Sequence, residues 1–165
     1  IYSKSFLIEK HFQTDIMSEH KNYDPAMHTT EHIFGRVMDN MFHCGKNITM
    51  HLEKKKSKCD FKFDRDITPE EKAQIEKNVN DVIRQHLDVK IYTLPREEAE
   101  KLVDVSKLPD ESKEASELRI VQIGDFDYSA CIGQHVSNTS QIKGVFRITT
   151  TTYDNGVLRT RWVVK

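Results

Sequence analysis

The sequence has no long hydrophobic run, few cysteines and almost no net charge, and each absence excludes a class of protein. No stretch approaches the roughly 18 apolar residues that a membrane-spanning helix needs, and the first residues lack the basic-then-apolar order of a signal peptide. The 3 cysteines are odd in number and far apart, a poor basis for a secreted disulfide scaffold. We therefore expect a cytoplasmic protein with no membrane partner.

Charge is abundant but balanced. Lys and Arg number 25 and Asp and Glu number 26, which gives a formal net charge of −1. The molecule as a whole has no strong field to attract nucleic acid, so such a partner must be met by local basic residues. We expect no DNA partner. The 165 residues suit one domain, and no repeat, low-complexity tract or internal boundary divides them.

Two amphipathic helices are indicated by apolar residues that recur every three or four positions. The first is predicted to begin after Asp24, which can cap it, with Pro25 at the first helical position, and to end at Gly45. The second begins at Thr68, where Thr-Pro-Glu-Glu forms a capping box, and its apolar stripe continues to Leu87.

The rest of the chain contains short runs that favour strands. Strands are predicted at 3–9, 47–53, 59–64, 90–94, 118–123, 145–152 and 157–164, a short helix at 96–103, and a polar loop at 104–117. The last two strands flank Asn155-Gly156, a strong hairpin signal. We therefore predict an α+β fold, a single domain over residues 1–165 with helices packed on a largely antiparallel sheet.

His28 and His32 are four residues apart on the first predicted helix, so their side chains point the same way and can meet one metal ion. At about 100° per residue, the apolar stripe of this helix centres near Phe34 and Val37, and both histidines lie more than roughly a third of a turn away. Burial in the core is therefore a poor explanation for the pair. Surface histidines and histidines that line a cleft both remain open.

A second pair of potential ligands, Cys131 and His135, has the same spacing. One thiolate and three imidazoles are suitable tetrahedral ligands for zinc. Gly133, which lies between Cys131 and His135, lets the backbone turn so that both of these side chains reach inward. Cys44 and Cys59 lack a nearby partner of this kind, and we expect both to be small buried hydrophobic residues. The two pairs together predict one zinc site.

The segment from His28 to His32 also matches H-x-x-E-H, the helix signature of the inverzincin metalloproteases. In that interpretation two histidines hold zinc, Glu31 is the general base and a distant carboxylate completes the site. Cys131 and His135 would then have no role. The small size of the chain and the second ligand pair argue against a protease.

The same residues carry a family resemblance. His28-Thr29-Thr30-Glu31-His32-Ile33-Phe34 resembles H-T-A-x-H-L-L, and the stretch from Cys131 to Ile148 resembles C-G-G-T-H-V-x-N-T-x-x-I-x-x-F-x-I. Between them, the strand at 59–64 and the helix that follows Thr68 resemble a D-F-D strand and an I-E-x-x-x-N helix. These patterns belong to the editing domain of alanyl-tRNA synthetase and to its free-standing relatives, the AlaX proteins, and the editing domain of threonyl-tRNA synthetase is a more distant relative.

The resemblance implies an α+β editing domain that binds zinc and hydrolyses the ester between a wrong amino acid and the 3′ end of tRNA. The implied zinc ligands, which are also the implied catalytic residues, are His28, His32, Cys131 and His135. The residues beside them that could contact the amino acid are Thr29, Gly133 and Gln134, although Thr29 could equally bond to its own helix. Basic residues that could meet tRNA phosphates are Lys143, Arg147, Arg159 and Arg161.

The family's C-G-G-T-H is here Cys-Ile-Gly-Gln-His, which lacks the first glycine and the threonine. The pattern C-x-G-x-H is shared with the threonyl editing domain, so the amino acid and the tRNA both stay open. Serine is the expected amino acid because both branches remove it, and Ser-tRNA(Ala) is the expected substrate. Four protein ligands would close a zinc site, whereas catalytic zinc usually keeps one position open for water. A non-catalytic RNA-binding module with structural zinc is therefore an alternative.

Overall fold

The computed structural model describes residues 23–106, 108 and 110–165, and it has the α+β architecture expected from the sequence. In chain order the elements are α2 (Pro25–Phe42), β1 (Thr49–Leu52), β2 (Ser57–Lys62), α3 (Pro69–Arg84), β3 (Val89–Pro95), α4 (Arg96–Ala99), α5 (Asp110–Lys113), β4 (Glu117–Ile123), β5 (Asp127–Ala130), the 3-10 helix η1 (Thr139–Gln141), β6 (Phe146–Asp154) and β7 (Val157–Val164). No helix in the described part of the chain is long and apolar enough to cross a membrane.

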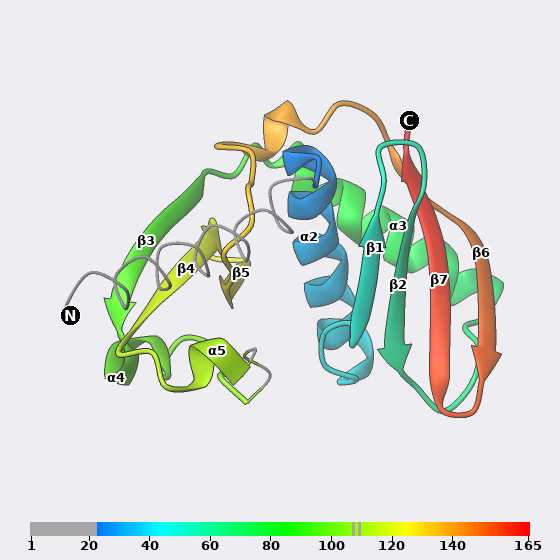
Figure 1. The fold of residues 1–165 in the computed structure, drawn as a ribbon. Helices are drawn as coiled ribbons and strands as arrows, with labels where there is room; N and C mark the ends of the chain where they lie inside the picture. Colours follow the sequence, from blue (N-terminus) through cyan, green and yellow to red (C-terminus); the bar gives the residue numbers. More distant parts are fainter. Residues whose placement is uncertain (1–22, 107, 109) are drawn as a thin grey trace, which may run out of the picture.

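The strands form two sheets, and both are antiparallel as predicted. A four-stranded sheet has the order β1-β2-β7-β6, and a three-stranded sheet has the order β3-β4-β5. Helix α2 lies between the two sheets, and α3 packs against β6 of the larger one (Figure 1). A helix in this position has a sheet on each side, and its two faces therefore meet different surroundings.

The N-terminus of α2 forms as predicted. The Asp24 carboxylate accepts hydrogen bonds from the backbone N–H groups of Ala26 and Met27, and Pro25 occupies the first turn. The helix ends at Phe42, three residues before the predicted end at Gly45. The reason is that His43 adopts a left-handed conformation, with φ of 54°, and donates its backbone N–H to the Asp39 carbonyl.

The capping box of α3 is confirmed. Thr68 accepts a hydrogen bond from the backbone N–H of Glu71, and the Glu71 carboxylate accepts one from the backbone N–H of Thr68. The hairpin is also confirmed, since β6 and β7 pair around Asn155 and Gly156, both of which have positive φ. These are the two places where short-range sequence signals were strongest.

The main hydrophobic core lies between the helices and the four-stranded sheet. Phe34 of α2 is fully buried, with ring centroids 5.2 Å from Phe61, 5.0 Å from Phe146 and 6.1 Å from Trp162. A smaller cluster of Ala99, Leu118 and Ile120 lies against the three-stranded sheet. Burial of these rings supplies the main apolar stabilisation of the fold.

Several expectations need correction. Strand β5 was not predicted, because Asp-Tyr-Ser-Ala lacks apolar alternation, and the predicted polar loop at 104–117 contains the short helix α5. The predicted helix at 96–103 is shorter and ends at Ala99. Cys59 is fully buried as expected, whereas Cys44 is only partly buried. The strand predicted at 3–9 lies outside the described residues.

Candidate metal centre

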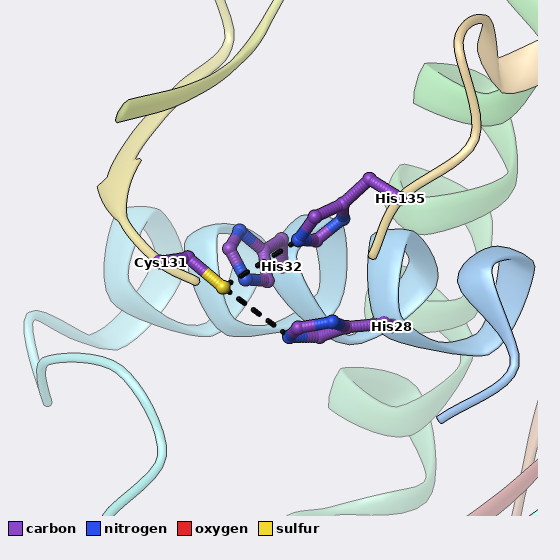
Figure 2. A group of neighbouring side chains, drawn as sticks. All are labelled: His28, His32, Cys131 and His135. Carbon is purple, nitrogen blue, oxygen red and sulfur yellow. Dashed lines mark hydrogen bonds between the residues drawn. The ribbon is translucent and has the colours of Figure 1, made fainter. Parts of the chain in front are cut away.

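Four side chains from two distant parts of the sequence converge beside α2 (Figure 2). One ligand atom from each of His28, His32, Cys131 and His135 lies within 4.8 Å of the other three. The Cys131 Sγ is 3.6 Å from Nε2 of His28 and 3.6 Å from Nε2 of His135. This group could hold a metal ion, and it consists of the four residues named from the two sequence pairs.

Gly133 allows the segment after β5 to approach α2 closely. A Cβ atom at this position would lie 2.2 Å from Cε1 and 2.6 Å from Nδ1 of His28, well inside van der Waals contact. Any side chain would therefore displace His28 or the segment. The glycine in C-x-G-x-H is thus explained by the packing of the two ligand pairs against each other.

Two of the three imidazoles, those of His28 and His135, are held by hydrogen bonds at Nδ1, and the third, that of His32, has a carboxylate facing its Nδ1, so that Nε2 of each faces the centre. Nδ1 of His28 is 3.1 Å from the carbonyl oxygen of Gln134, and Nδ1 of His135 is 3.0 Å from Oγ1 of Thr29. Nδ1 of His32 faces the Asp127 carboxylate at 3.5 Å. Partners of this kind fix the ring orientation of metal-binding histidines and place the lone pair on the other nitrogen.

In the hydrogen bond between Thr29 and His135, the donor can be identified from the other partners of the Thr29 hydroxyl. It donates to the carbonyl oxygen of Pro25 at 2.9 Å, one helical turn earlier, so it accepts from Nδ1–H of His135. The backbone N–H of Val136 is a second donor to it at 3.2 Å. Thr29 is fully buried. The back-bonding alternative for Thr29 is therefore observed, and its hydroxyl positions His135.

Asp127 is a fully buried carboxylate at the edge of the centre, and three cationic side chains converge on it. Nζ of Lys46 lies 2.7 Å and Nε of Arg36 2.9 Å from Oδ1, while Oδ2 faces His32. Burial favours the neutral acid, but the charges of Lys46 and His32 outweigh it and hold the pKa of Asp127 well below its ordinary value. Asp127 therefore supplies a permanent negative charge beside His32.

The remaining pKa shifts follow from this arrangement. Burial alone would lower the pKa of His32, but Asp127, Cys131 and Glu31 raise it to about 10. Burial raises the pKa of Cys131, but hydrogen bonds from His135 and His28, and the charge of His32, lower it to about 2. Burial and the neighbouring imidazoles lower the pKa of His135 to about 4. A thiolate and a neutral imidazole are the forms that bind a metal, whereas His32 must release a proton to do so.

The centre forms part of the wall of a cavity of about 660 Å³ between α2 and the three-stranded sheet. His28, His32 and Cys131 line it, together with the side chains of Glu31, Arg36, Lys46 and Arg119. Arg36 is four residues after His32 on the same helix, so helical spacing could have identified it. Lys46 and Asp127 are brought in by the tertiary fold and have no local sequence signal.

The other predicted site residues do not line the cavity. Thr29, Gly133 and Gln134 stand next to the ligands but do not line the cavity, and Gln134 contacts His28 through its backbone carbonyl. The predicted tRNA contacts also lie away from the cavity, and these are Lys143, Arg147, Arg159 and Arg161. Arg147, Arg159 and Arg161 belong to the four-stranded sheet, and Arg159 forms two hydrogen bonds to Asp60, each 2.8 Å long.

Comparison with known proteins agrees with the resemblance. Residues 118–159 match the family described as the threonyl and alanyl tRNA synthetase second additional domain. An alanyl-tRNA editing protein AlaX-M of Methanosarcina barkeri is 40% identical over 125 residues, which cover 72% of this chain and 49% of the relative. An alanine–tRNA ligase of Staphylothermus marinus is 35% identical over 108 residues, which cover 66% of this chain and 12% of the relative.

The chain thus spans about half the length of the AlaX-M relative and a small part of the ligase. The matched family segment contains Cys131 and His135, one of the two ligand pairs. The resemblance inferred from the sequence is confirmed, because the chain is similar to the threonyl and alanyl tRNA synthetase second additional domain, to alanyl-tRNA editing proteins of the AlaX-M type and to alanine–tRNA ligases.

Proposed function

We propose that residues 1–165 form a single editing domain that hydrolyses the ester of wrongly charged aminoacyl-tRNA in trans, with zinc held by His28, His32, Cys131 and His135. The observation that carries this proposal is the convergence of these four donors at the wall of a cavity. The names of the relatives support it, since one of them is an alanyl-tRNA editing protein.

Zinc fits the donor set because it accepts imidazole and thiolate together in a tetrahedral arrangement. When bound, it would supply Lewis acidity toward the ester carbonyl. The protein's own contribution is to fix the donors. Asp127 and Thr29 orient His32 and His135, and the Gln134 carbonyl orients His28. The cavity beside this centre gives the ester a place to bind next to the metal.

We propose serine as the amino acid and Ser-tRNA(Ala) as the substrate. A cavity of about 660 Å³ is large enough for an aminoacyl-adenosine end, and ligand sites of this size are typical of small molecules. We propose that the phosphates of the tRNA body are contacted by Lys143, Arg147, Arg159 and Arg161. The affinity for tRNA should then fall as the salt concentration rises. Arg36, Lys46 and Arg119 are basic residues that line the cavity in which we place the 3′ end.

Two other functions are disfavoured by the same geometry. A metalloprotease of the H-x-x-E-H type would leave Cys131 and His135 without a role, although their donor atoms lie within 4.8 Å of those of His28 and His32. A non-catalytic RNA-binding module would have a structural zinc ion, which needs no adjoining cavity. Here three of the four donors face one.

The test is release of labelled serine from Ser-tRNA(Ala) and Ser-tRNA(Thr) by the zinc-loaded protein, with Ala-tRNA(Ala) as the correctly charged control. We expect release from one mischarged tRNA and its loss in Cys131→Ala. Absence of release from both, with one zinc per chain, would support the RNA-binding module. Peptide cleavage that is lost in Glu31→Gln but retained in Cys131→Ala would support the protease.

A further inference from the structure

Glu31 is a buried carboxylate that faces the metal centre and is not among its four donors. Only 5% of the residue is exposed, and it lines the same cavity as His28 and His32. Its Oε2 lies 3.9 Å from Nε2 of His28 and 3.8 Å from Nε2 of His32, the two atoms that face the centre. The carboxylate therefore adjoins the place where a reacting ester would lie.

No hydrogen bond to the Glu31 carboxylate is formed within the part of the chain that is described, and its nearest charged neighbours are the Nε2 atoms of His28 and His32, 3.9 and 3.8 Å away. The basic side chains of the cavity contact other groups, because Arg36 and Lys46 both contact Asp127 and Arg119 donates to the carbonyl oxygen of Cys131. The nearby imidazoles cannot serve either, since Nε2 must carry a lone pair and not a proton when it holds a metal. A buried acceptor without a hydrogen-bond donor is unfavourable, so this carboxylate is suited to a ligand that brings N–H donors, such as an ammonium group.

An aminoacyl ester carries such a cation close to its reacting carbon. The α-ammonium nitrogen is separated from the carbonyl carbon by two bonds, about 2.5 Å. An ester whose carbonyl lies at the metal centre must therefore bring its ammonium group within a few ångströms of that centre. Entry into a buried cavity removes water from the ammonium group, and this loss must be offset by an opposite charge.

We propose that Glu31 binds the α-ammonium group of the aminoacyl ester and so selects esters of free amino acids. This inference rests on the proposed function, because it assigns a role within that site. It also predicts a substrate class. Esters whose amino group is blocked or replaced, such as those of peptidyl-tRNA, lose the contact and leave the buried Glu31 carboxylate without a hydrogen-bond donor.

The experiment measures binding, so that it does not depend on turnover. The probes are two non-hydrolysable amides of 3′-amino-3′-deoxyadenosine, one carrying serine and the other carrying the α-hydroxy acid in which a hydroxyl replaces the ammonium group. Calorimetry with the zinc-loaded protein should show that the serine amide binds about 10- to 100-fold more tightly, the range expected for a hydrogen bond to a charged group. Glu31→Gln should bind the two amides equally and still hold one zinc per chain.

The matched control is Glu117→Gln, which removes an exposed carboxylate from the lining of the same cavity. This variant should keep the preference for the serine amide. The inference is overturned if Glu31→Gln keeps the preference, if it weakens both amides equally, or if it loses zinc, which would make Glu31 a ligand. Tight binding of the serine amide without hydrolysis of Ser-tRNA would refute the proposed function alone, and binding of neither amide would refute both.

Discussion

The two faces of α2 are both buried, but they are buried for different reasons. One face contributes Ile33, Phe34 and Met38 to the main core, where each is fully buried among apolar side chains. The other presents His28, Glu31, His32 and Arg36 to the cavity and the three-stranded sheet. A single helix thus separates a dry aromatic core from a centre rich in buried charge.

The difference shows which face stabilises the fold and which serves a site. Burial of apolar rings is favourable in proportion to the area removed from water. Burial of histidine, glutamate and aspartate is costly unless each is paired or binds a ligand. The charged face is therefore explained by the ion pairs of Asp127 and by four donors that could hold a metal, and the two faces should respond differently to substitution.

The largest effect is expected from Phe34→Ala. Loss of a fully buried phenylalanine should lower the free energy of unfolding by about 3–5 kcal/mol, because the surrounding rings cannot close the cavity that it leaves. Chemical denaturation of the metal-free protein measures this change. Metal affinity of the folded variant should stay within about twofold of the parent, since Phe34 lies on the face opposite the centre and contributes no donor.

Met41→Ala is the control on the same helix, because Met41 is only partly buried and packs at the edge of the core. Met41→Ala should lower the free energy of unfolding clearly less than Phe34→Ala does. The independence of the two faces would be disproved if Phe34→Ala weakened metal binding in proportion to the loss of stability.

The sequence predicted the helix with both faces, because a period of 3.6 residues separates Phe34 and Val37 from His28 and His32. The four donors that lie within 4.8 Å of one another could also be named, since each pair has a spacing of four residues. Asp127 and Lys46 could not be named. Both act through contacts between residues distant in sequence, and a lone acid or lysine has no periodic signal.

The burial of the site residues and the hydrogen bonds of Thr29 could not be predicted from the sequence. The histidines were expected on a surface or in a cleft, and the structure places them in the wall of a cavity with 1% and 6% of their surface exposed. Thr29 was considered as a contact to the amino acid because it adjoins a ligand. Spacing alone could not show that its hydroxyl is already shared by Pro25, His135 and Val136.

An intermediate effect is expected from Thr29→Val, which keeps the shape of the side chain and removes the acceptor for Nδ1–H of His135. Loss of such a partner typically weakens metal binding about 10- to 100-fold. Competition with a chromophoric chelator measures the affinity for zinc. The matched control is Thr30→Val, where a neighbouring buried hydroxyl donates only to its own helix, to Ala26.

Thr30→Val should leave zinc affinity nearly unchanged. If Thr29→Val kept full zinc affinity but raised KM for the aminoacyl-tRNA, Thr29 would be a substrate contact and not a positioning residue. If both variants weakened zinc equally, the effect would belong to the helix and not to the hydrogen bond with His135.

The smallest effect is expected from exposed charge at the start of α3, far from the buried charge of the metal centre. Hydrogen bonds from Arg65 and from the backbone N–H of Thr68 lower the pKa of Glu71 from 4.5 to about 2. A carboxyl whose pKa is lower in the folded state stabilises the fold above its unfolded pKa, and this contribution is lost as pH falls through its folded pKa. Glu71→Gln should therefore lower the free energy of unfolding by less than about 1 kcal/mol at pH 6, since solvent screens the ion pair.

The measurement is the Tm of both proteins between pH 6 and pH 2, with the exposed neighbour substituted in Glu70→Gln as the control. The difference between parent and Glu71→Gln should shrink as pH falls from about 4.5 to about 2, because the parent gains the proton that the amide mimics. Glu70→Gln should show a smaller difference, since Glu70 forms no part of the capping box. A difference in Tm that stayed constant to pH 2 would mean that Glu71 stabilises α3 through packing and not through its charge. The exposed carboxylate of Glu71 and the buried carboxylate of Asp127 would then act through different kinds of interaction, and not through the same interaction at different strengths.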